Sequence, residues 1–259
     1  MNHLYHTLSP LILLAAFLVS LLAFLAPTPI LSDRVSLLSV STNVPAPSTD
    51  AARRWLADDI AHSGPVHLSR MVKRAKKSNS TSPAAKAATT EPIHLVFGPL
   101  GACFSNSTTS EPVCASPSFT PIFLDLYDTL SLPAALQDAL PDQFPLAPTA
   151  LFASLVLLAF QFLAVVFSSL SMHFTKRFAF LGAKQPTHRK AATVAGVFSL
   201  AIGLAATIAL RVQLAKVVEK LDGTSATGSL GPSFQQLFAG AALEAVASLL
   251  LIAEALTSR

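Results

Sequence analysis

The sequence predicts an all-α membrane protein, in which a bundle of four transmembrane helices carries a small, disulfide-tied, partly β extracellular cap. The first observation is composition: 52% of the 259 residues are hydrophobic, only 12% are charged, and the mean hydropathy is +0.55. Soluble proteins contain about twice that share of charged residues. The second is that four apolar stretches have the length of a membrane-spanning helix, about 17 to 25 residues. The third is that both cysteines flank a glycan acceptor in one polar patch.

The first apolar stretch covers residues 9–26 and follows a short N-terminal segment, residues 1–8. No Lys or Arg precedes it, its apolar run is long, and Pro27 follows the small residue Ala26 at the point where cleavage would occur. A cleaved signal peptide is the alternative. These features favour a retained transmembrane helix.

Three further stretches complete the predicted bundle. The second covers residues 149–170 and the third residues 191–210, and neither contains a charged residue. The apolar face of the third continues to about residue 221, so we expect this helix to extend beyond the bilayer. The fourth covers residues 234–256 and carries Glu244 close to its middle.

The loop between the second and third spans, residues 171–190, determines the predicted orientation. It contains five basic residues and no acidic one: Lys176, Arg177, Lys184, Arg189 and Lys190. Short loops rich in Lys and Arg stay in the cytoplasm, and four spans then place residues 1–8 and 257–259 there too. Residues 27–147 and 211–233 are extracellular in this topology. The basic residues are divided between two sides of a membrane, so the net charge of +4 does not indicate a nucleic-acid partner.

Cys103 and Cys114 lie in the long extracellular segment, on either side of the glycosylation acceptor Asn106. Disulfides and Asn-linked glycans both form in the secretory compartments, which agrees with the orientation derived from charge. We therefore predict a disulfide, with two free thiols as the alternative. Closing this ten-residue loop contributes on the order of 3 kcal/mol to stability. Asn79 is a second acceptor.

The rest of the extracellular segment is expected to form short elements. Residue alternation and β-branched or aromatic content predict strands at 35–40, at 93–98 and within 118–130. Helical spacing of apolar residues predicts short helices within 51–64 and 131–140. Residues 67–92 are rich in Lys, Ser, Ala and Pro, and we expect a solvated stretch. Its basic run, residues 73–77, is either solvated or in contact with anionic wall polymer or lipid headgroups.

A stripe of small residues recurs every four positions along the third span, at Ala195, Ser199, Gly203 and Thr207. Such a stripe lets another helix approach closely. We expect the partner helix to belong to the same bundle, with a homo-oligomer contact as the alternative.

Glu244 is the candidate functional residue within the membrane, because an ionisable group at mid-depth is energetically costly. Gln161 lies at a similar depth in the second span. We hypothesise that protonated Glu244 forms a hydrogen bond with Gln161 across the bundle. The alternative is a protonated Glu that fills a polar niche and serves packing alone.

The sequence indicates no enzyme. The seven histidines do not cluster at metal-ligand spacing, and no nucleophile or base accompanies the acidic pair Asp125 and Asp128. We therefore predict no catalytic residue, no metal site and no cofactor. The expected partners are membrane lipids and laterally packed proteins or further copies of the chain, with cell-wall polymer as another candidate.

The cysteine region resembles the claudin-like superfamily, and more narrowly the fungal Sur/PalI family of four-span plasma-membrane proteins. Gly98 precedes Cys103 by five residues, Cys114 follows, and the continuation "CASPSFTPIF" is similar to the family pattern. Leu100 stands where the family has an aromatic residue, and Pro99 replaces an aliphatic one.

The resemblance implies a non-enzymatic glycoprotein of the plasma membrane that organises domains of the cell cortex, such as eisosomes. It further implies a link to cell-wall integrity or ambient-pH signalling. The alternative function is a membrane transport or channel component that uses the intramembrane Glu244.

Overall fold

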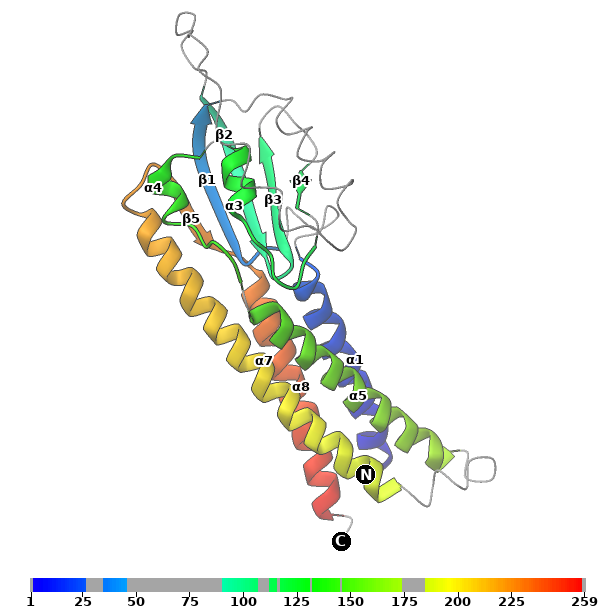
Figure 1. Cartoon of the computed structure of the whole chain (residues 1–259). Helices are drawn as coiled ribbons and strands as arrows, with labels where there is room; N and C mark the ends of the chain where they lie inside the picture. The colour runs from blue at the N-terminus through cyan, green and yellow to red at the C-terminus, as the bar shows by residue number, and fades with distance from the viewer. Residues whose placement is uncertain are drawn as a thin grey trace, which may run out of the picture.

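The structure is a computed structural model that combines long helices with a five-stranded antiparallel sheet (Figure 1). The long helices are α1 (Asn2–Phe24), α5 (Ala147–His173), α7 (Gln185–Leu221) and α8 (Ser233–Thr257). The sheet lies at one end of these helices, and the N- and C-termini lie at the other end (Figure 1). The structure describes residues 2–26, 35–45, 90–106, 112–115, 117–130, 132–144, 146–173 and 185–257.

Within these ranges, three helices are long and apolar enough to cross a membrane. The qualifying segments are residues 147–170 of α5, 190–221 of α7 and 233–253 of α8, while α1 contributes a shorter apolar stretch, Leu8–Phe24. Their length and composition indicate a membrane protein.

The helices carry apolar side chains on their outer faces as well as on their inner ones. On α5, Phe152, Phe160 and Phe167 are about half exposed, whereas Leu151 and Leu158 are buried. A helix that is apolar on all sides is typical of a membrane span, because exposing its outer apolar face to water would be unfavourable.

The sheet has the strand order β4-β3-β2-β1-β5, with every neighbouring pair antiparallel. The strands are β1 (Leu38–Pro45), β2 (Thr90–Gly98), β3 (Gly101–Asn106), β4 (Val113–Cys114) and β5 (Thr227–Leu230). Strand β5 comes from the connection between α7 and α8, yet it pairs with β1, which follows α1 in the chain. The sheet therefore brings together a segment near the start of the chain and a segment near its end.

One face of the sheet is apolar because buried residues alternate along the strands. Ile93, Leu95 and Phe97 of β2 are fully buried, as the two-residue period of a strand requires. Phe97 meets Phe123 edge-on, with ring centroids 5.2 Å apart and planes at 89°. The helices α3 (Leu124–Thr129) and α4 (Ala134–Gln137) belong to this cap.

Tyr127 of α3 is fully buried within the cap. Its hydroxyl donates a hydrogen bond of 2.7 Å to the main-chain oxygen of Pro141. Burial, and to a lesser extent the nearby carboxylate of Asp142, raises the pKa of Tyr127 well above its ordinary value. The phenol therefore stays protonated and remains a donor, which satisfies a carbonyl in the loop before α5.

The apolar core of the cap is continuous with the interior of the helix bundle. Buried residues of the sheet, such as Leu38 and Phe97, belong to the same cluster as Phe24 of α1, Leu210 of α7 and Phe234 of α8. The cap is therefore packed directly onto the helix ends and does not hang from flexible connections.

The strand predicted within residues 118–130 is wrong, because this segment contains the helix α3. Its buried residues Phe123, Leu126, Tyr127 and Leu130 follow the i, i+3, i+4, i+7 spacing of a helix. The β-branched and aromatic content of the segment suited either structure, and burial of this face against the sheet favoured the helix.

The other predicted cap elements vary in outcome. The structure has a strand over 93–98, which begins earlier, at Thr90, whereas the strand expected at 35–40 begins at Leu38. The helix within 131–140 spans only Ala134–Gln137. Strands β3, β4 and β5 were not predicted. The helix expected within 51–64 and residues 67–89 of the predicted solvated stretch lie outside the described residues, whereas residues 90–92 of that stretch form the start of β2, a correction to the prediction.

We predict that Phe97→Ala lowers the free energy of unfolding by about 3–5 kcal/mol, because it removes the ring that joins sheet, α3 and helix ends. Thermal unfolding of the purified protein in mild detergent measures the effect. Phe198→Ala is the matched control, because its ring lies on the exposed face of α7 and is 58% exposed. Equal destabilisation by the two substitutions would contradict a shared core.

Candidate functional site

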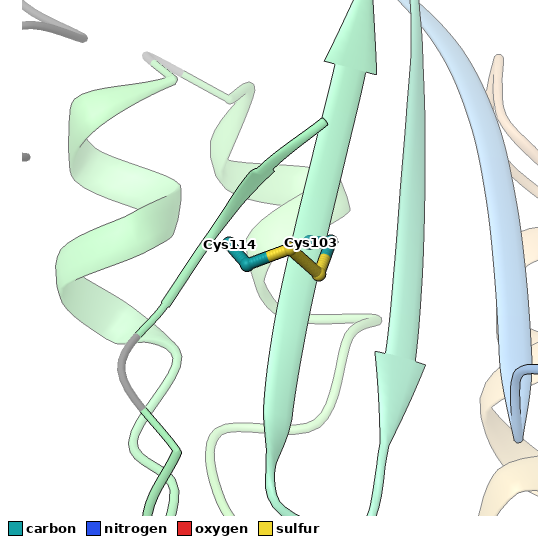
Figure 2. The surroundings of a disulfide bond; sticks show 2 residues. All are labelled: Cys103 and Cys114. Atoms are coloured by element: carbon teal, nitrogen blue, oxygen red, sulfur yellow. A yellow bond between two sulfur atoms is a disulfide. The ribbon is translucent and has the colours of Figure 1, made fainter. Parts of the chain in front are cut away.

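The disulfide joins β3 to β4, the strand at one edge of the sheet. Cys103 of β3 and Cys114 of β4 are bonded through their sulfur atoms and lie directly opposite each other in the strand register (Figure 2). The predicted disulfide is thus confirmed. Strand β4 has only two residues, too few to hold its place by main-chain pairing alone. The covalent bond therefore defines this edge of the sheet.

The residues of the family-like motif gather at the hairpin between β2 and β3. Gly98 pairs with Gly101 across the turn formed by Pro99 and Leu100. The main-chain oxygen of Leu100 accepts a hydrogen bond of 2.8 Å from the Ser118 amide. The motif thus connects the hairpin to the segment that follows Cys114.

The segment after β4 packs against the ends of two helices nearest to the sheet. The ring of Phe119 lies 5.1 Å from that of Phe152 on α5 and 6.5 Å from that of Phe24 on α1, measured between centroids. The disulfide-bonded edge is therefore coupled to the bundle by an aromatic cluster.

Of the two predicted glycan acceptors, only Asn106 lies within the described residues. Asn106 is the last residue of β3, and the residues after it, 107–111, lie outside the described part of the chain, as does Asn79. Glycosylation at both positions stays a prediction.

Inside the bundle, Gln161 of α5 is fully buried and bridges to α8. Its side-chain nitrogen Nε2 donates a hydrogen bond of 3.0 Å to the hydroxyl of Ser248. Helix α7 passes close by at Gly196, where a Cβ atom would overlap with the amide group of Gln161. The absence of a side chain at Gly196 thus makes room for the amide.

The predicted hydrogen bond between Glu244 and Gln161 is wrong. Glu244 lies one helical turn before Ser248 on α8, and its carboxyl group interacts with the hydroxyl of Ser199 on α7. The sequence placed Glu244 and Gln161 at a similar depth, but counting residues from the span ends does not resolve a single turn, which is about 5.4 Å. In the structure, Gln161 pairs with Ser248, which lies on the turn of α8 after Glu244.

The small-residue stripe of α7 runs past α5. The hydroxyl of Ser199 donates a hydrogen bond of 2.9 Å to the main-chain oxygen of Ser154, and a Cβ atom at Gly203 would lie 3.2 Å from the Ser154 hydroxyl oxygen. Ala195 and Thr207, at the two ends of the stripe, are also buried. Small side chains allow this close approach of the two helices.

A cavity of about 30 Å³ lies between the four long helices. Its polar lining consists of Ser20 of α1, Ser154 of α5, Ser199 and Thr207 of α7, and Glu244 of α8. Leu, Phe, Ala and Gly residues form the rest of the wall. A volume of this size is large enough for a water molecule or a small ion.

Comparison of the chain with models of known protein families found no match, and a search of the curated proteins found none. In the described part of the chain, no group of three or more His, Cys, Asp or Glu residues is arranged to hold a metal ion.

Several residues that make or permit polar contacts inside the bundle were not predicted from the sequence. Ser154, Ser248 and Gly196 all make or permit the contacts described above, and Gly240 of α8 approaches Ser20 so closely that a Cβ atom would overlap with its hydroxyl. A signal existed, because a Ser or Gly inside an apolar span indicates a helix contact.

We predict that replacing both cysteines, Cys103→Ser with Cys114→Ser, lowers the free energy of unfolding by about 3 kcal/mol, because the unfolded chain is no longer constrained. Thermal unfolding with and without reductant measures this. Reductant should lower the Tm of the native chain and leave the double variant unchanged. A reductant effect of equal size on both would mean that the bond does not stabilise the cap.

We also predict that Gly196→Ala destabilises the bundle by about 1–3 kcal/mol, because the added methyl group overlaps with Gln161. Gly223→Ala is the control, since a Cβ atom there meets only the Lys220 carbonyl at 3.7 Å. Adding Gln161→Ala to Gly196→Ala removes the overlap, so the double variant should lose less stability than the sum of the single losses. Simple additivity in unfolding measurements would refute the contact.

Proposed function

We propose that the protein is a four-span, claudin-like plasma-membrane protein of the Sur/PalI type that organises domains of the cell cortex without catalysing a reaction. Helix α1, the first in the chain, completes the set of four spans with α5, α7 and α8. Its apolar stretch Leu8–Phe24 is about 26 Å long at 1.5 Å per residue, close to the roughly 30 Å of the hydrocarbon core. Four spans leave both termini in the cytoplasm and the sheet outside.

The observation that carries this proposal is the apolar core shared by cap and bundle. A cap packed onto the helix ends holds a defined orientation relative to the membrane. A contact of the cap with a neighbour or with wall polymer then also orients the helices beneath it. Half-exposed apolar side chains on the helices supply the surface for lateral packing with lipid and other subunits.

A second function, transport or channel activity through Glu244, is favoured by the cavity beside this residue. A cavity of about 30 Å³ accepts a water molecule or a small ion but no metabolite. We therefore rank a transport role for metabolites below the organising role.

The proposal is tested by imaging a fluorescently tagged full-length chain in walled cells. We expect stable cortical patches that recover slowly after photobleaching, because subunits are held by lateral and cap contacts. The double variant Cys103→Ser, Cys114→Ser should reach the surface but recover faster, since its cap edge is released. Ser229→Ala, an exposed position on β5, is the control and should behave like the native chain.

A uniform surface distribution of the native chain with fast recovery would overturn the organising role, and so would retention in internal membranes. Proteoliposomes prepared from the same purified chain test the second function. A solute or ion flux that Glu244→Gln abolishes would establish transport instead.

A further inference from the structure

We propose that the cavity between the four helices binds one small monovalent cation of the Na⁺ class, in exchange for the proton of Glu244. The exchange is balanced: the carboxylic acid releases its proton, and the resulting carboxylate is neutralised by the bound cation. This inference goes beyond the organising role and does not depend on it.

The first support is that the cavity presents oxygen lone pairs. Three of its hydroxyl groups donate their single proton to main-chain oxygen atoms. The donor-to-acceptor distances are 2.8 Å from Ser154 to Leu151, 2.9 Å from Ser199 to Ser154 and 2.8 Å from Thr207 to Gly203. A hydroxyl whose proton is engaged can only accept or coordinate through its oxygen. Hydroxyl, carbonyl and carboxylate oxygens are the ligands that hard cations prefer.

The second support is the state of Glu244. Its side chain is only 5% exposed, it lines the cavity, and no group in the described residues donates a hydrogen bond to its Oε1. Ser199 donates its single proton to the main-chain oxygen of Ser154, so while that hydrogen bond is made its hydroxyl has no second proton for a carboxylate. An ionised Glu244 therefore needs a positive charge in the cavity.

The third support is that the described residues lining the cavity supply no such charge. Glu244 is the single titratable side chain among the described cavity-lining residues, and α1, α5 and α7 present only hydroxyl, glycine and apolar groups to the space. Arg211 of α7 is exposed, its guanidinium lies 5.6 Å from the centroid of the Phe238 ring, and it does not line the cavity. Two species can neutralise the carboxylate: a proton on it or a cation beside it.

The size and position of the cavity agree with this assignment. About 30 Å³ accommodates an ion of the Na⁺ class but not a large organic cation. The polar wall comes from all four helices, so a bound cation would tie them together. A cation that binds only the folded state stabilises the folded state, and this stabilisation grows with the cation concentration.

The test measures the Tm of the full-length chain in lipid nanodiscs, in about 0.15 M NaCl and in N-methylglucamine chloride of equal ionic strength. We expect a Tm higher by several degrees in NaCl, with a larger difference at pH 8 than at pH 6, because protons compete with the cation. Glu244→Gln should abolish the difference, and Ser199→Ala should weaken the apparent Na⁺ affinity about tenfold. Glu219→Gln, an exposed position on α7, is the matched control and should retain it.

A second measurement uses only the native chain, so it holds even if the variants do not fold. In weakly buffered solution, NaCl should release protons from the protein, and N-methylglucamine chloride should not. The proposal is overturned if NaCl releases no proton, or if Glu244→Gln keeps the full Na⁺ dependence of the Tm. Neither outcome affects the organising role, which rests on the cap.

Discussion

The apolar core that joins the sheet to the helix ends is the interaction on which the rest of the structure depends. Phe97 of the sheet, Phe24 of α1 and Leu210 of α7 all belong to this core, so the cap and the bundle have one continuous interior. A cap with so few residues buries little surface by itself. The helix ends complete this core, and the sheet holds the adjoining ends of α1, α7 and α8 at fixed positions.

The disulfide stabilises the β4 edge of the sheet, which the shared core supports least. Strand β4 has two residues and lies farthest along the sheet from β5, which the α7–α8 connection anchors. Covalent attachment of Cys114 to Cys103 keeps the following segment in place. In that segment, Phe119 makes an aromatic contact with Phe152 of α5, so this edge is held by the disulfide to β3 and by a contact with a long helix.

The interior of the bundle follows a different rule, because lipid offers no water to an unpaired polar group. Gln161 and Ser248 satisfy each other in part, and Ser199 links Ser154 to Glu244. These contacts require close helices, which Gly196 permits by having no side chain. Polar pairs and glycines together specify how the helices align along their axes, whereas uniform apolar faces would tolerate sliding.

The sequence by itself determined the long apolar helices, the bonded cysteines and the interior polar residues Gln161 and Glu244, because length, hydropathy and residue type are local properties. Tertiary structure alone decided which partners those residues have. The Gln161–Ser248 pair depends on the axial offset of α5 and α8, and the helical state of residues 124–129 depends on the sheet face they cover. Strand β5 has no apolar pattern of its own and exists because β1 presents an open edge beside it.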